Sequence, residues 1–143
     1  MQDGASQRSG TAEAIILIKA APVIGDKHGE TVCSAGIDLY GNWLRMYPVS
    51  FRVLEDGKRF KRWDKVKFDW RQPSNDPRIE SRHVNNQTLE ICGQMKPKER
   101  PAFLNKHIVT SLAKELEEGR SLALLYPEVL EFKVVEKPPA KLE

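Results

Sequence analysis

Turn-forming residues interrupt this chain at intervals of roughly ten residues, and the stretches between them are short and rich in β-branched and aromatic side chains. The interruptions include Tyr40-Gly41-Asn42 and Asn85-Asn86. Stretches of this length are too short for repeated strand–helix–strand units and are typical of a small closed or half-closed barrel. We therefore expect an α+β fold, a small mixed β-barrel of about seven short strands with one main packing helix.

Residues 64–71 form the clearest expected strand. Val66, Phe68 and Trp70 alternate with charged side chains there, so one face is apolar and the other is mostly basic. Gly41-Asn42 is expected to join two further strands in a hairpin, and Pro48 is expected to end the second of them. The other expected strands are 15–18, 31–39, 43–47, 78–84, 88–92, 122–125 and 129–135.

One helix is expected over residues 101–118. Leu104, Ile108, Leu112 and Leu116 recur every four residues and would form an apolar stripe that packs on the sheet. Pro101 suits the first turn, and Gly119 follows as a C-terminal cap. Residues 51–54 are expected to add a helical turn.

The length of 143 residues and the 40% apolar content are those of one ordinary globular domain. We expect a flexible lead over 1–12, a compact domain over 13–136 and a flexible tail over 137–143. No apolar run approaches the roughly 20 residues that span a bilayer, so no membrane partner is expected. Cys33 and Cys92 fit no metal-ligand spacing, so we expect no metal site, and no other cofactor is expected. The two cysteines are expected to be small core residues. Unpaired thiols indicate a reducing compartment, so a cytoplasmic location is expected.

Basic and aromatic residues are concentrated between Gly41 and Arg71. This stretch holds all three tryptophans and nine lysines and arginines against four acids, although the net charge of the whole chain is only +3. Such interleaving suits a surface that binds phosphates and stacks on bases. The pattern predicts nucleic acid, DNA or RNA, as the partner.

The period of two places Trp43, Arg45 and Tyr47 on one face of their strand, with Leu44 and Met46 on the other. If Leu44 and Met46 are core residues, two rings with a guanidinium between them face outward. The alternative is that Trp43 and Tyr47 form the core side. A solvated outer face is likewise the alternative for the basic side chains. The residues expected to bind nucleic acid are Trp43, Arg45, Tyr47, Arg52, Lys61, Arg62, Trp63, Lys65, Lys67, Arg71, Arg78 and Arg82.

No catalytic motif is present, and catalytic residues stay unassigned. One alternative function is an enzyme acting on nucleic acid or nucleotides, with Glu80 or His83 as acid or base. A metal-dependent nuclease would need converging acids, for which Asp64, Asp69 and Glu80 are the candidates. A second alternative is a protein-interaction adaptor in a mobile-element or defence complex, because aromatic residues and arginine also favour protein interfaces.

The segments GNWLRMYPVSFR and RFKRWDKVKF resemble a group of uncharacterised bacterial proteins with a W-[IL]-R-[LM]-Y-P-V-x-F-R stretch followed by F-K-x-[WY]-D. The upstream GETVCSAGI and the downstream SLALLYPEVLEF are similar to that group as well. The resemblance implies one coherent domain and brings no activity with it. The pattern WDKVKF is also similar to the entry strand of PUA-like small barrels that bind RNA or modified DNA, which is a likeness of fold alone. The matching positions of the first resemblance are Trp43, Leu44, Arg45, Met46, Tyr47, Pro48, Val49, Phe51, Arg52, Phe60, Lys61, Trp63 and Asp64.

Overall fold

The computed structural model describes residues 7–20, 23–25, 29–50 and 56–137. It contains two short α-helices in these residues, α1 (Arg100–His107) and α2 (Leu112–Glu117). Three single 3₁₀ turns, η2 (Asp56–Lys58), η3 (Asn86–Thr88) and η4 (Pro97–Glu99), connect the other elements. The strands are β1 (Ser9–Lys19), β2 (Val23–Gly25), β3 (Gly29–Asp38), β4 (Trp43–Val49), β5 (Asp64–Arg71), β6 (Ser81–Val84) and β7 (Glu90–Gln94).

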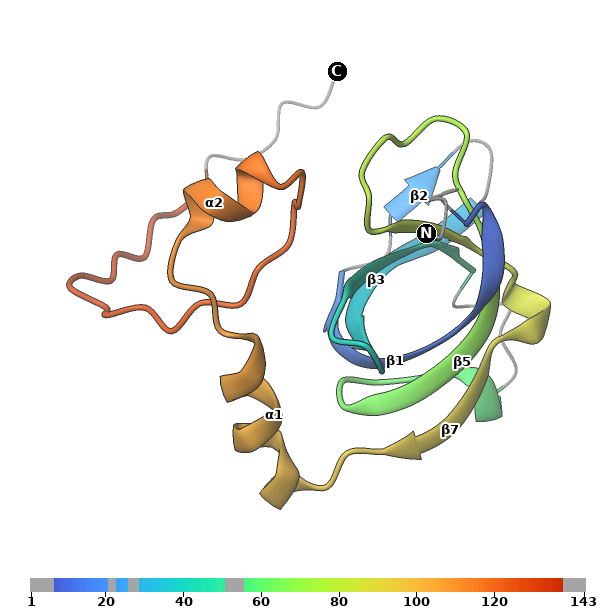
Figure 1. The fold of residues 1–143 in the computed structure, drawn as a ribbon, viewed down its shortest axis with the longest axis horizontal. Helices are drawn as coiled ribbons and strands as arrows, with labels where there is room; N and C mark the ends of the chain where they lie inside the picture. Colours follow the sequence, from blue (N-terminus) through green and yellow to red (C-terminus); the bar gives the residue numbers. More distant parts are fainter. Residues whose placement is uncertain (1–6, 21–22, 26–28, 51–55, 138–143) are drawn as a thin grey trace, which may run out of the picture.

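Five of these strands close a small barrel in the order β1-β3-β4-β6-β5, because β5 pairs back onto β1 (Figure 1). The pairing of β4 with β6 is parallel and the other pairings are antiparallel, so the sheet is mixed. β7 adds to β5 outside the closed ring, and β2 adds to β3. The expected small mixed β-barrel is therefore confirmed, with five strands rather than about seven closing it.

The long strand β1 makes closure possible because it serves two neighbours. Its first part, from Ser9 to Ile15, pairs with β5, and its second part, from Ala14 to Lys19, pairs with β3. A register shift between Ile16 and Ile18 bends the strand where it passes along β3. Pairing from Ser9 also corrects the expected flexible lead over 1–12, because four of those residues belong to the barrel.

The barrel interior is filled by the inward side chains that the period of two selects. Val66 and Phe68 are buried there, as the alternation on β5 predicts, together with Ile16 and Phe60. On β4, where the alternation left either face possible, Leu44 and Met46 are the buried side. Gly36 on β3 lies so close to Ile15 on β1 that any Cβ at this position would collide with the Ile15 carbonyl oxygen. A glycine is therefore required at this close approach of the two strands.

A second apolar cluster lies outside the barrel and holds α1 in place. Ile15, Leu17 and Ile37 project outward from β1 and β3 and are covered by side chains that include Trp43, Trp63, Met95, Phe103 and Leu104. Phe103 and Leu104 come from α1, so this helix packs against the outer wall. Only the first part of the expected leucine stripe is used in this way.

The expected single helix over 101–118 is wrong, because the chain leaves the helical path after His107. The β-branched run Ile108-Val109-Thr110 follows, and the Val109 N–H donates to the Leu124 carbonyl at 2.9 Å. The Ser111 hydroxyl then accepts from the Lys114 N–H and begins α2 as its N-cap. As a result Leu112 and Leu116 are 55% and 74% exposed instead of packing on the sheet.

Several other expected boundaries change. The expected strands 122–125 and 129–135 are absent from the described residues, apart from one isolated bridge between Ile108 and Leu124. β4 does not end at Pro48 but continues to Val49, which pairs with Val32. β6 and β7 begin at Ser81 and Glu90, later than expected, and the expected helical turn over 51–54 lies outside the described residues.

The two cysteines are free thiols. Both were expected to be core residues, and neither is fully buried. Cys33 is half-buried and Cys92 is exposed on β7. Partial desolvation and the nearby Glu13 carboxylate raise the pKa of the Cys92 thiol. Among the described residues, neither helix is long and apolar enough to cross a bilayer.

Candidate nucleic-acid interface

The outer faces of β4, β6 and β5 bring three candidate side chains into one row. The register places Tyr47 opposite His83 on the parallel pair β4–β6 and His83 opposite Arg71 on the antiparallel pair β6–β5. Neighbouring strands lie about 5 Å apart, so a phenol, an imidazole and a guanidinium stand side by side. Tyr47 is 46% exposed, and Arg71 is exposed as well.

This row forms the floor of a groove of about 550 Å³. The loop between β5 and β6 makes one wall of the groove, with Pro73, Ser74 and Asn75 facing it. Among the described residues, four arginines line the groove, against one acid, Asp76, so this lining is strongly cationic. The arginines are Arg45, Arg71, Arg78 and Arg82. Five of the residues predicted to bind nucleic acid, these four and Tyr47, therefore come together here.

Asp76 fixes the loop wall. Its carboxylate accepts from Arg78 Nε at 2.9 Å, from Arg78 Nη2 at 2.7 Å and from the Ser81 hydroxyl at 2.7 Å. The hydrogen bonds from Arg78 hold the pKa of Asp76 well below its usual range, and Asp76 in turn raises the pKa of Arg78. The two parallel hydrogen bonds from Nε and Nη2 fix the orientation of the Arg78 guanidinium, and Asp76 makes no hydrogen bond to its Nη1.

Arg82 and Arg71 are positioned by their neighbours too. Arg82 donates through Nη1 to the Ile79 and Ser81 carbonyls, and its guanidinium lies 4.3 Å from the centroid of the Trp70 ring. Burial lowers the pKa of Arg82 from its ordinary value. Arg71 Nη2 lies 3.2 Å from His83 Nε2. Because arginine can only donate, Nε2 accepts, and this contact requires the neutral His83 tautomer with its proton on Nδ1.

A buried ion pair separates this groove from a second cavity. Arg45 Nε lies 3.9 Å from Glu80 Oε1, and the side chains are 19% and 4% exposed. Ser121 completes the arrangement, since its hydroxyl accepts from Arg45 Nη2 at 2.9 Å and donates to Glu80 Oε1. The Ser121 N–H also donates to Glu80 Oε1 at 3.3 Å. The carboxylate thus ties the chain that follows α2 to the barrel.

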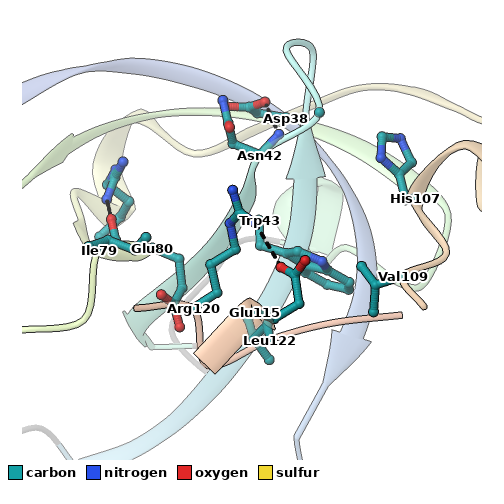
Figure 2. Close-up of a pocket in the computed structure, with 12 residues that line it drawn as sticks. Asp38, Asn42, Trp43, Ile79, Glu80, His107, Val109, Glu115, Arg120 and Leu122 are labelled. Carbon is teal, nitrogen blue, oxygen red and sulfur yellow. Dashed lines mark hydrogen bonds and ion pairs between the residues drawn. The ribbon is translucent and has the colours of Figure 1, made fainter. Parts of the chain in front are cut away.

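The second cavity, of about 330 Å³, lies between the β3–β4 hairpin and the chain around α2 (Figure 2). Trp43 lies at its centre, with Asn42 on one side and His107 on another. Arg120 crosses it and binds Glu115 Oε2 at 2.8 Å. Partial burial, with a smaller contribution from Lys106, lowers the pKa of His107. We call this cavity the Trp43 pocket; Arg82 lines both it and the groove.

Other predicted binding residues lie elsewhere. Trp63 packs into the outer apolar cluster, and the Arg100 guanidinium lies over its ring, 4.9 Å from the centroid. The prediction that Trp63 offers an open stacking surface is therefore wrong. Arg62 Nε donates to the Leu17 carbonyl at 3.0 Å. Lys61, although exposed, does not line the groove. Arg52 lies outside the described residues.

Lys65 and Lys67 point outward from β5, as the alternation predicts, yet they do not line the groove. The register places Lys67 directly between Glu13 on β1 and Glu90 on β7. Two glutamates beside one lysine neutralise this part of the face. The excess of positive charge along the sequence is therefore not an excess at this point of the surface.

The residues considered for catalysis are separated. Glu80 lines the Trp43 pocket, whereas His83 lines the groove. Asp64 accepts from the Lys61 N–H at 2.9 Å and from Gln94 Nε2 at 3.0 Å, and Asp69 accepts from the Thr11 hydroxyl at 2.6 Å. Within the part of the chain that the structure describes, no three His, Cys, Asp or Glu side chains gather as a metal site.

Sequence reasoning missed two parts of this site. The fixed wall of the groove depends on Asp76, which lies in the segment QPSNDP that composition marks only as a loop. A DPR sequence, with an acid two positions before an arginine, is the local signal that could have indicated the clamp on Arg78. No local signal in the sequence indicates the wall of the Trp43 pocket around α2, because the position of this wall depends on the contacts of Ser121 with Arg45 and Glu80.

No curated protein and no solved structure matched this chain. A family model did match, over residues 10–109, which cover the barrel and α1. The chain therefore belongs to the family described as domain of unknown function DUF8758.

Proposed function

We propose that this chain is a nucleic-acid-binding module that holds a strand in the groove between β4 and the β5–β6 loop. The observation that carries this proposal is the gathering of four arginines, Tyr47 and His83 around one groove whose described lining contains a single acid. That acid, Asp76, is already engaged by Arg78. Guanidinium groups bind phosphate oxygens through paired N–H donors, and each phosphate contact releases counterions.

Arg71 and Arg78 are the proposed phosphate ligands. Both are exposed, and both are held from one side by a neighbour, His83 or Asp76. Side chains that are already oriented lose less conformational entropy when a ligand binds. Arg45 and Arg82 are engaged with Glu80, Ser121 and backbone carbonyls, so they contribute charge to the groove while they maintain its shape.

Tyr47 and Trp43 are the proposed stacking surfaces, in two separate places. Tyr47 lies on the groove floor, where a base can stack on its half-exposed ring. Trp43 lies in its own pocket, whose volume of about 330 Å³ is near the lower end of the range for small-ligand sites, about 300–1,000 Å³. Arg82 lines both cavities, so both belong to one cationic region of the surface.

A single strand fits this arrangement better than a duplex. The stacking surfaces lie inside a groove and a pocket, and a base reaches them only when it is not paired in a helix. Free thiols are typical of a reducing compartment, so a cytoplasmic location is part of the proposal.

Fluorescence anisotropy with labelled single- and double-stranded DNA and RNA tests the proposal, at about 50 and 200 mM salt. We expect single strands to bind and the affinity to fall steeply with salt. Arg71→Ala is expected to weaken binding several-fold. Lys98→Ala, which removes one exposed positive charge on η4 away from the groove, is expected to leave it nearly unchanged.

Two results would overturn the proposal. The absence of binding at the lower salt would reject nucleic acid as the partner. Equal effects of Arg71→Ala and Lys98→Ala would show that binding is a general response to charge and does not use the groove.

A further inference from the structure

The chain from α2 onward exposes an unusual amount of apolar surface. Of the fourteen large hydrophobic residues that are exposed in the described residues, nine lie between Leu112 and Val135. Val129, Leu130, Phe132, Val134 and Val135 are between 72% and 88% exposed. Figure 1 shows this part of the chain, in orange to red, looping away from the barrel. None of these side chains lines the groove, so their exposure calls for a separate explanation.

Residues 129–135 have the pattern of a β-strand. Leu130, Phe132 and Val134 alternate with Glu131 and Lys133. The Lys133 ammonium lies 3.3 Å from Glu131 Oε1, so these two side chains project to the same side of the backbone. The segment nevertheless pairs with no strand in the part of the chain that the structure describes. It is an amphipathic strand sequence without a partner.

The order of residues in this segment is complementary to itself. When two copies run antiparallel with Phe132 opposite Phe132, Leu130 faces Val134 of the second copy on the apolar side. On the other side, Glu131 faces Lys133, and Lys133 faces Glu131. Apolar and opposite-charge neighbours of this kind are the pairs that stabilise antiparallel strands.

Neighbouring registers lack this complementarity. A shift of two residues in one direction places Glu131 opposite Glu131, and a shift in the other direction places Lys133 opposite Lys133. Like charges directly opposite each other are unfavourable. In the complementary register, Glu128 faces Glu136 at the two ends, which limits the pairing to residues 129–135.

We infer that residues 129–135 pair with the same residues of a second copy of this chain, as an antiparallel two-stranded ribbon about a two-fold axis. Such an interface is isologous, with the same patch on both copies. A two-stranded ribbon alone is marginal in water, so its apolar face must be covered. The exposed Leu112 and Leu116 of α2 supply apolar surface on the same part of each chain. The inference is independent of the proposed nucleic-acid groove.

Charge reversal tests the pairing. Sedimentation equilibrium over a wide range of concentration is expected to give a dimer for the unchanged chain. Lys133→Glu and Glu131→Lys each create two like-charge pairs across the axis, and each is expected to weaken dimerisation about tenfold. Lys137→Glu makes the same change of charge outside the pairing and serves as the matched control.

The decisive experiment mixes the two single variants. An acidic copy with Lys133→Glu and a basic copy with Glu131→Lys are complementary to each other, so the mixture is expected to form a heterodimer at concentrations at which each variant alone is monomeric. The double variant with both changes is expected to dimerise with itself. A monomeric unchanged chain at all concentrations, or a mixture that associates no better than its components, would overturn the inference.

Discussion

Tyr47 and His83 lie directly opposite each other on β4 and β6, the parallel pair of the barrel. In chain order they are 36 positions apart (83 minus 47), and closure of the barrel brings them to one groove. Arg71 extends the same row on the other side of His83. This row provides an aromatic face and a positive charge at one place, as the proposed binding of a nucleic-acid strand requires.

The Tyr47 ring provides the first prediction. Tyr47→Ala is expected to lower the affinity for single-stranded nucleic acid about tenfold, because stacking of one base is worth about 1–3 kcal/mol. The fold is expected to remain, since the ring is half-exposed. Tyr40→Ala, on the exposed tip of the β3–β4 hairpin, is the matched control in anisotropy measurements. An equal loss in both variants would contradict the assigned role of Tyr47.

The lysines of β5 are expected to affect stability more than binding. Lys67→Glu places three carboxylates side by side on β1, β5 and β7. We expect the free energy of unfolding to fall by up to about 1 kcal/mol. The loss is measured in urea titrations, and it should be larger at low salt than at high salt because salt screens the repulsion between the carboxylates. A large loss of nucleic-acid affinity in this variant, comparable with that of Arg71→Ala, would move the interface from the groove to the β1–β5–β7 face.

The buried pair of Arg45 and Glu80 gives the third prediction. Glu80→Ala leaves the Arg45 guanidinium largely buried without its carboxylate and removes the acceptor of Ser121. Loss of one partner from a buried pair typically costs about 3–5 kcal/mol, and the lower value is expected because Arg45 is partly exposed. The double variant Arg45→Met/Glu80→Leu is expected to recover most of the loss in denaturant unfolding. A double variant no more stable than Glu80→Ala would contradict this account.

Asp76 makes stability depend on acid pH. Its pKa in the folded chain lies well below that of an unfolded aspartate, about 3.9. The unfolded state therefore binds more protons in this window, and stability rises with pH. The contribution of Asp76 is fully present above the unfolded pKa and is lost as pH falls from about 5 toward the folded pKa.

Comparison with Asp76→Asn tests this dependence. Asparagine cannot ionise and pairs less well with Arg78, so the variant is expected to be less stable at neutral pH. The difference from the unchanged chain should shrink as pH falls from about 5 to 2 in denaturant titrations. A difference independent of pH would mean that Asp76 acts through packing and not through its charge.

Gly36 is expected to tolerate no side chain. In Gly36→Ala the new Cβ meets the Ile15 backbone, which cannot move without disturbing the β1–β3 pairing. Overpacking of this kind costs about 1–3 kcal/mol. Gly57→Ala is the control, because no atom beyond the two adjacent residues lies within 4 Å of a Cβ built there. Thermal unfolding of the two variants compares them directly, and equal midpoints would show that β1 and β3 can separate at little cost.

Much of the barrel was predictable because strand alternation is a local property. The apolar face of β5, which includes Val66 and Phe68, follows from the period of two and is buried as expected. On β4 the same period left either face possible as the core side, and the structure buries Leu44 and Met46. The prediction of a single helix was wrong because the spacing of its leucines does not show where the helix breaks. Leu104 and Leu112 have the right spacing, but the break at Ile108–Thr110 directs them to different surroundings.

The amino-acid sequence by itself determined which side chains share a face on each strand, because alternation depends only on neighbours along the chain. The short strands between regularly spaced turn signals also predicted the small mixed barrel. Only the tertiary structure decided which charges lie together. Lys67 received two glutamates as neighbours, whereas Arg71 joined three other arginines around a groove. Register and barrel closure set those neighbours, and both depend on contacts between residues far apart in the chain.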